Sequence, residues 1–164
     1  MEPLRIRRYD DRDHDAVWRL HNLALNEVGA HAGSGPWDDD LHSIESVYLD
    51  GGGEFLVGLI GQEIVAMGAL RRVAKDCGQI TRMRVHPRAQ GRGLGRKILE
   101  RLEARARELG YERLTLDTTV GQITAQRLYR RHGYIETGRT RYGPFDVILF
   151  EKSLANPERM SNGH

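Results

Sequence analysis

The most informative residues of this chain are three alternating glycines, Gly91, Gly93 and Gly95, which lie between a strand-like segment and an amphipathic helical one. Glycine has no Cβ atom that would keep a ligand away from the backbone. At a helix N-terminus, unpaired N–H groups and the positive end of the helix dipole converge on one point. Nearby basic side chains can add charge: Arg88, Arg92, Arg96 and Lys97. The segment predicts a pyrophosphate site, and a tight turn that merely uses glycine is the alternative.

The glycine spacing narrows the choice among phosphate ligands. A dinucleotide-binding fingerprint has the form G-x-G-x-x-G, whereas the third glycine comes one residue early here. Asp117 lies about 20 residues further on, on a predicted strand, which keeps dinucleotide binding open as an alternative. A P-loop is excluded, because no Gly-Lys-Ser/Thr sequence follows the glycines.

Hydrophobic periodicity predicts the elements that hold this loop in place. Strands are expected at 4–9, 54–60, 63–73, 79–86, 113–119, 134–141 and 145–152. Helices are expected at 14–28, 94–109 and 122–132, with a further short helix that begins at Asp38. This order predicts an α/β domain in which helices pack on a single sheet. The domain is expected to span 1–154, followed by a flexible tail at 155–164.

Composition and charge restrict the class of protein. The formal net charge is +2, and no apolar stretch approaches the roughly 20 residues that cross a bilayer. Neither a membrane partner nor a signal segment is expected, which favours a cytoplasmic protein. The single cysteine, Cys77, rules out a disulfide framework and a multi-cysteine metal site.

Three further patterns favour structural roles over ligand binding. His14 and His21 are seven residues apart, whereas a metal pair on a helix needs three or four, so both are expected at the surface. The acidic run Asp38–Asp40 is expected to cap a helix, and no metal is expected. The basic segment 82–107 lacks the interleaved aromatic residues that stack on bases, so no nucleic acid partner is expected.

A family resemblance makes the glycine segment more specific. Gln90–Gly95 resembles the Q/R-x-x-G-x-G/A signature of the GNAT superfamily of N-acetyltransferases. Further along the chain, Ala125–Tyr134 is similar to that family's A-x-x-L-Y-x-x-x-G-F/Y helix. Arg82–Pro87 and Leu114–Thr118 resemble its fourth and fifth strands. The predicted element order is also that of the family, so the resemblance covers residues 4–152.

The resemblance implies a mixed, mostly antiparallel sheet of about seven strands flanked by helices, with the fourth and fifth strands splayed apart around acetyl-CoA. The backbone of 83–85 would pair with the pantetheine arm, and 90–96 would hold the pyrophosphate. The residues implied to contact the cofactor are Met83, Arg84, Val85, Gln90, Gly91, Arg92, Gly93, Leu94, Gly95, Arg96, Gln122 and Tyr129. The implied reaction is direct attack of a primary amine on the thioester, with both reactants held in one cleft.

Tyr129 is implied as the general acid that protonates the departing thiolate, and packing in the core is its alternative role. Gln79 stands where several family members have a glutamate base, and an amide cannot accept the proton. The remaining candidates for the base are Glu27, His31, His86, Asp117 and a chain of water molecules. The missing glutamate leaves an acyl-CoA-binding sensor of the same fold, without catalysis, as an alternative function.

The acceptor is expected to be a small-molecule or peptide amine, and a homodimer is left open because the family commonly forms one. Residues 26–50 contain no lysine or arginine, and their acids would form a negative rim: Glu27, Asp38, Asp39, Asp40 and Glu45. Such a rim attracts cations, which predicts a cationic or zwitterionic amine. His31 could titrate in this region, and Trp37 could offer an apolar face. The alternative is that these acids only cap a helix and solvate the surface.

Overall fold

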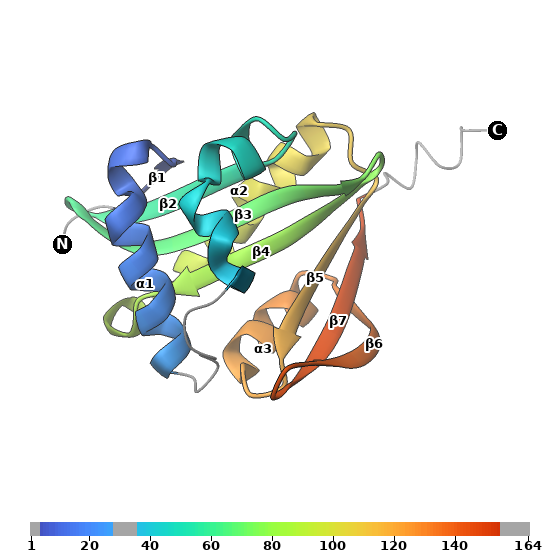
Figure 1. The fold of residues 1–164 in the computed structure, drawn as a ribbon. Helices are drawn as coiled ribbons and strands as arrows, with labels where there is room; N and C mark the ends of the chain where they lie inside the picture. The colour runs from blue at the N-terminus through green and yellow to red at the C-terminus, as the bar shows by residue number, and fades with distance from the viewer. Residues whose placement is uncertain (1–3, 28–35, 155–164) are drawn as a thin grey trace.

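The computed structural model builds a sheet of seven strands in the order β1-β2-β3-β4-β5-β7-β6 (Figure 1). It describes residues 4–27 and 36–154. The strands are β1 (Leu4–Arg8), β2 (Glu54–Ile60), β3 (Glu63–Ala74), β4 (Cys77–Val85), β5 (Arg113–Thr119), β6 (Ile135–Tyr142) and β7 (Phe145–Ser153). β4 and β5 pair in parallel, and the other neighbouring pairs are antiparallel. The mixed, mostly antiparallel sheet predicted from the sequence is therefore confirmed.

The helices lie close to their predicted bounds. They are α1 (His14–Glu27), α2 (Leu94–Glu108) and α3 (Ile123–Arg131), with short turns η1 (Asp11–Asp13), η2 (Pro36–His42), η3 (Glu45–Leu49) and η4 (Pro87–Ala89). The short helix predicted from Asp38 is instead a 3₁₀ turn, η2, followed by a single π-helical turn, η3. The predicted tail at 155–164 lies outside the described residues.

Each face of the sheet has its own hydrophobic core. On one side, called here the α1 face, α1, η2 and η3 cover the sheet and bury Val17, Leu41, Tyr48, Phe55 and Met67, among others. On the other, the α2 face, α2 and α3 bury Leu99, Leu102, Leu114, Tyr129 and Phe150, among others. Side chains alternate along a strand, so each strand residue points to one of these two faces.

β4 and β5 separate after a short stretch of pairing, as Figure 1 shows. The paired positions run only from Cys77 opposite Arg113 to Gln79 opposite Thr115. Beyond them β4 stays paired with β3, whereas β5 stays paired with β7. Among the described residues, one edge of the outer half of β4 therefore has no strand beside it, which confirms the splayed pair that the family resemblance implies.

A bulge in β4 lies inside this opening. Thr81 is opposite Ala69 and Arg84 is opposite Met67, so two β4 residues face one β3 residue between them. Arg82 has a φ of +58°, and it is the one non-glycine residue with positive φ in the described ranges. Such a conformation costs about 1–2 kcal/mol for an L-residue and needs support from its surroundings. The bulge turns successive β4 side chains toward groups that a regular strand would not bring together.

Candidate active site

The glycine loop joins β4 to α2 and leaves the N-terminus of that helix open. The η4 turn at its start is fixed by His86, whose Nδ1 accepts a 3.0 Å hydrogen bond from the Arg88 backbone N–H. Gly91 and Gly93 have φ values of +81° and +76°, which favour glycine. α2 has no side-chain cap and no acidic residue in its first turn. An anion can therefore bind at its first N–H groups, and the pyrophosphate site predicted from the sequence stays a prediction.

The arginines of this loop are all exposed and only weakly engaged. Arg88 lies 3.2 Å from Glu63, and Arg96 lies 3.5 Å from Glu100. Arg92 extends from the turn between the two positive-φ glycines and is exposed. Exposed ion pairs of this kind contribute little, so a phosphate group can compete for these side chains.

Tyr129 lies on α3 with its ring in the core of the α2 face. The ring centroid is 5.8 Å from that of Tyr134 and 6.3 Å from that of Phe150, and the residue is 4% exposed. Burial raises the pKa of Tyr129 to about 12, and the nearby Arg84 guanidinium offsets part of the effect. The phenol therefore keeps its proton at neutral pH and can serve as a donor. The packing role and the acid role are compatible.

Gln122 fastens the start of α3 to the end of β5. Its Oε1 accepts 3.0 Å hydrogen bonds from the Thr119 backbone N–H and from the hydroxyls of Thr118 and Thr119. Gln126, one turn later, donates to the backbone carbonyls of Thr119 and Val120. These contacts fix the wall of the opening that carries Tyr129. The Nε2 group of Gln122 is the part of its side chain that could donate to a cofactor.

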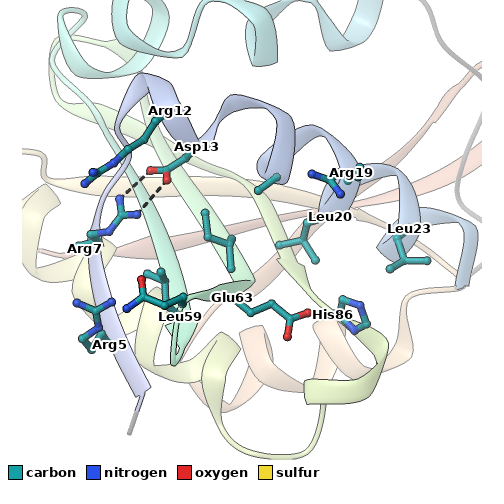
Figure 2. Close-up of a pocket in the computed structure, with 13 residues that line it drawn as sticks. Arg5, Arg7, Arg12, Asp13, Arg19, Leu20, Leu23, Leu59, Glu63 and His86 are labelled. Carbon is teal, nitrogen blue, oxygen red and sulfur yellow. Dashed lines mark hydrogen bonds and ion pairs between the residues drawn. The ribbon is translucent and has the colours of Figure 1, made fainter. Parts of the chain in front are cut away.

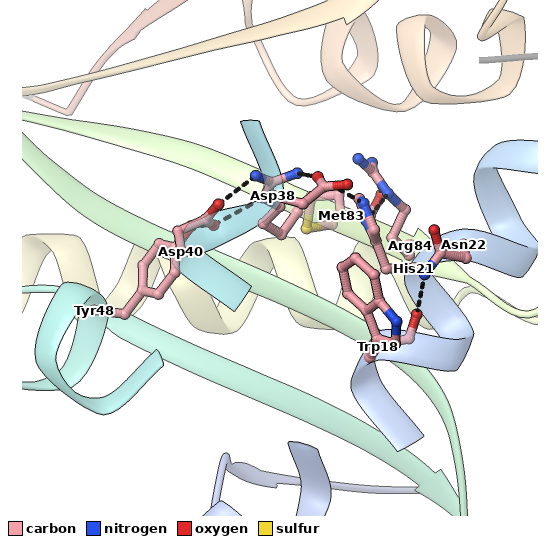
Figure 3. A network of polar contacts seen from close by, with 9 residues as sticks. Trp18, His21, Asn22, Asp38, Asp40, Tyr48, Met83 and Arg84 are labelled. Atoms are coloured by element: carbon pink, nitrogen blue, oxygen red, sulfur yellow. Dashed lines mark hydrogen bonds and ion pairs between the residues drawn. The ribbon is translucent and has the colours of Figure 1, made fainter. Parts of the chain in front are cut away.

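On the α1 face, two aspartates hold the bulge residue Arg82 in a network that Figure 3 displays. Its Nε and Nη2 donate to the two Asp40 oxygens at 3.0 and 2.5 Å, and its Nη1 donates to Asp38 at 3.1 Å. The Tyr48 hydroxyl donates to the same Asp40 carboxylate at 2.5 Å. Burial alone would raise the pKa of Asp40, but the attraction of Arg82 outweighs it and holds the pKa below its usual value. The clamp supports the strained backbone of Arg82.

The Arg82 clamp contradicts one sequence prediction and weakens another. Asp38 does not cap a helix: it is 3% exposed and its carboxylate pairs with Arg82 and His21. The negative rim is also weaker than predicted, because Arg82 neutralises Asp38 and Asp40, and of the acidic run only Asp39 is exposed. The physical reason is that a guanidinium buried at a bulge needs counter-charges, and this run supplies them.

His21 is also misplaced by the sequence prediction, which put it at the surface. It is 0% exposed, because it follows Val17 by one helical turn and shares its buried side of α1. Its Nε2 lies 3.0 Å from the Asp38 carboxylate, and Arg84 Nε donates to its Nδ1 at 3.3 Å. Arg84 can only donate, so Nδ1 accepts and Nε2 carries the ring proton. The histidine thus ties α1 to both η2 and β4.

Arg84 and Asp117 belong to the opening between β4 and β5. Arg84 is opposite Met67 of the α1-face core, and Asp117 follows Leu116 of the α2-face core, so alternation places both on the α1 face. Burial, together with repulsion from Arg82, lowers the pKa of Arg84 to about 10. Burial raises the pKa of Asp117, and the charges of Arg84 and Arg82 oppose that rise. Each charge affects the other, although no ion pair joins them.

Asp117 is the candidate base that the described residues bring to this opening. His86 instead caps η4 and lines a separate hollow of about 820 Å³ between α1 and β1 (Figure 2). Glu27 is the last residue of α1. His31 lies outside the described residues, as does the side chain of Trp37.

Other chemistries find little support in the described part of the chain. No group of three His, Cys, Asp or Glu side chains there is placed to hold a metal ion. Cys77 is buried, and burial raises the pKa of its thiol, which makes it a poor nucleophile. None of the described helices is long and apolar enough to cross a membrane.

Residues 14–134 match the Acetyltransferase (GNAT) family. The chain belongs to this family. The IAA acetyltransferase of Azospirillum brasilense is 40% identical over 103 residues, which are 61% of this chain and 67% of that protein. A GNAT-family acetyltransferase from Staphylococcus aureus Mu50 has a TM-score of 0.86 at 21% identity, covering 93% of this chain and 100% of that one. The Salmonella typhimurium acetyltransferase yncA, solved with its cofactor acetyl-CoA, has a TM-score of 0.77 at 22% identity, covering 93% and 94%.

Membership of the GNAT family defines the class of enzyme: an N-acetyltransferase with acetyl-CoA as its cosubstrate. The fold and the glycine loop that the sequence predicted agree with this class. Sequence reasoning missed the α1-face network of His21, Asp38, Arg82 and Arg84. Its signal was Arg82 and Arg84 on an interior strand, where a buried arginine requires a partner.

Proposed function

We propose that this GNAT enzyme transfers the acetyl group of acetyl-CoA to a primary amine by direct attack in a ternary complex. The opening between β4 and β5 carries the proposal. The anion-binding end of α2 follows one of its walls, β4, and Tyr129 follows the other, β5. A cosubstrate bound by its phosphates at α2 can extend along β4 toward the tyrosine.

The backbone of β4 supports an extended cofactor arm. The His86 N–H donates to the Val65 carbonyl, so the backbone N–H and C=O groups of residues 84 and 86 face β3. Alternation then turns the N–H and C=O groups of Met83 and Val85 toward the open side. Those groups can pair with the amides of the pantetheine arm as a neighbouring strand would. Arg84 lies between them with its backbone N–H and C=O turned toward β3, so it holds the β4 backbone in place and its side chain is not a proposed cofactor contact. The loop 90–96 and Gln122 complete the proposed cofactor contacts.

The acetyl transfer needs one bond formed, one bond broken and one proton moved to sulfur. The amine nitrogen bonds to the thioester carbon as the C–S bond breaks. The Tyr129 hydroxyl donates its proton to the leaving sulfur, because its raised pKa keeps it protonated. The nitrogen loses one proton to a base or to water, and the phenol recovers one from solvent. The products are an N-acetylated amine and the free thiol of CoA.

Thiol release measured with acetyl-CoA and a panel of primary amines tests this function. The proposal predicts amine-dependent release of CoA thiol together with an acetylated amine in the mass spectrum. Tight acetyl-CoA binding without release for any amine would instead identify an acyl-CoA sensor. That alternative rests on Gln79, which stands in place of a glutamate at the last position of β4 that is paired with β5.

A further inference from the structure

Two arginines of β4, Arg82 and Arg84, have very different hydrogen-bond and ion-pair partners. Arg82 is held by two carboxylates. Arg84 donates from Nε to His21 and from Nη1 to the Met83 carbonyl at 2.8 Å, and neither acceptor is an acid. Within the described residues, no carboxylate forms an ion pair with Arg84 and no group accepts a hydrogen bond from its Nη2. This cation is oriented but not neutralised.

The support behind Arg84 holds the side chain in one direction. His21 accepts from its Nε and is itself fixed by Asp38, so the guanidinium cannot change direction without breaking its hydrogen bonds to His21 and to the Met83 carbonyl. Figure 3 shows the guanidinium of Arg84 reaching past His21, away from α1. Its charge also acts on Tyr129 and Asp117, which lie on the other wall of the opening. The guanidinium therefore lies within electrostatic reach of the other wall of the opening.

Asp117 is the opposite charge on that other wall. Solvent reaches its side chain, although the walls of the opening around it raise its pKa. No described residue forms a hydrogen bond or ion pair with its carboxylate. Arg84 and Asp117 influence each other's ionisation but remain too far apart for an ion pair. A partly buried cation without a counter-ion costs free energy, and the protein could remove that cost by closing the pair. Keeping the two charges apart leaves room for a ligand that satisfies both.

We propose that Arg84 and Asp117 bind the acceptor as a zwitterion, with its carboxylate at Nη2 of Arg84 and its amino group beside Asp117. The substrate class is a free amino acid. The inference rests on the proposed acetyl transfer and names its acceptor. Asp117 draws the ammonium group to the thioester and accepts the proton that the nitrogen must lose before it attacks, and the second proton, lost after attack, passes to water. The phosphate loop and Tyr129 serve the donor, whereas these two residues select the acceptor.

Matched acceptor pairs test the proposal directly. Thiol release is measured with alanine and ethylamine, methionine and 3-(methylthio)propylamine, and phenylalanine and phenethylamine. The wild-type enzyme should favour the amino acid in at least one pair by roughly 10- to 100-fold in kcat/KM, the range for a hydrogen-bonded charge pair. Equal values within every pair, or a preference for the amines, overturn zwitterion binding and leave acetyl transfer standing. No release with any acceptor overturns the proposed function itself.

Variants separate acceptor binding from other roles of Arg84. Arg84→Gln should raise KM for the amino acid and leave KM for acetyl-CoA unchanged. The ratio of kcat/KM for the amino acid to kcat/KM for its matched amine should then come close to one. Arg84→Lys should restore part of the preference. Arg71→Gln, at an exposed arginine of β3, is the matched control and should keep the wild-type ratio. An equal loss for both members of a pair would show that Arg84 acts on the thioester and would overturn the proposal.

Discussion

The two ends of the proposed reaction site are built in opposite ways. The donor end, from η4 through Gly95, is made of consecutive residues that leave backbone N–H groups open. The acceptor end on the α1 face joins side chains from α1, η2, β4 and β5, which are far apart in the sequence. The difference teaches that the donor site is a local property of the chain, whereas the acceptor site depends on the assembled fold.

Both ends nevertheless share one physical feature. At α2, the first N–H groups lack a side-chain cap. On β4, Arg84 lacks an acidic partner in the described residues, while its neighbour Arg82 has two. Polar groups in folded proteins are normally satisfied, so groups left open in a supported geometry indicate where a ligand supplies the missing contact.

The largest effect is expected from a substitution that removes the proton donor and leaves both binding ends intact. Tyr129→Phe should lower kcat by about 10²-fold or more, because the leaving thiolate loses its proton donor. KM for acetyl-CoA should stay close to the wild-type value, since the ring still packs on Tyr134 and Phe150. Tyr142→Phe, at an exposed tyrosine of β6, is the control. Wild-type kcat in Tyr129→Phe would assign this tyrosine to packing.

A change at the donor end should affect acetyl-CoA without regard to the acceptor. Gly93→Val places a β-branched residue at φ +76° and should raise KM for acetyl-CoA by roughly 10-fold or more, because contacts to a charged phosphate are lost. Gly110→Val has the same type of strain, at φ +85°, at the other end of α2. The two variants should lose similar stability in thermal unfolding, and only Gly93→Val should lose donor binding. Equal KM values in both would contradict a phosphate site at Gly93.

A change in the Arg82 clamp should affect stability and the acceptor end together. Asp40→Asn removes the charge that Arg82 and Tyr48 bind, which should cost about 1–3 kcal/mol in the free energy of unfolding by urea. Because the folded pKa of Asp40 is lowered, its contribution is present above the unfolded pKa and is lost as pH falls through the folded one. Asp39→Asn, one residue away and exposed, should change little. Similar losses in the two variants would argue against the clamp.

The pH profile gives the smallest and most specific effect. Burial raises the pKa of Tyr129 to about 12, so loss of the acid should not lower kcat/KM between pH 7 and about 10. A fall in kcat/KM above pH 8 that occurs in the wild-type enzyme and is absent in Tyr129→Phe would contradict this account. It would show that the pKa of the Tyr129 phenol is lower than its burial allows.

The comparison also explains what the sequence could and could not predict. Strand and helix positions follow from periodicity, and the glycine loop was readable because Gly91, Gly93 and Gly95 act through their own backbone. His21 and Asp38 were assigned to the surface and to a cap, because nothing local shows that they meet over the sheet. Their pairing depends on where α1 and η2 pack, which is a long-range result of core burial.

The strained bulge at Arg82 is a further example. Alternation along 79–86 predicts a regular strand, and no glycine marks the position with positive φ. Asp38 and Asp40 hold the guanidinium on the α1 face and so help to stabilise the bulge. Those contacts join residues that are more than forty positions apart in the sequence, so local propensity could not predict them.

Isothermal titration of acetyl-CoA tests the central claim, that the donor site is local and independent of the acceptor end. The account predicts micromolar binding to the wild-type protein, the same affinity for Arg84→Gln, and weaker binding for Gly93→Val. Absence of binding to the wild-type protein at millimolar acetyl-CoA, or an equal loss of affinity in both variants, would contradict it.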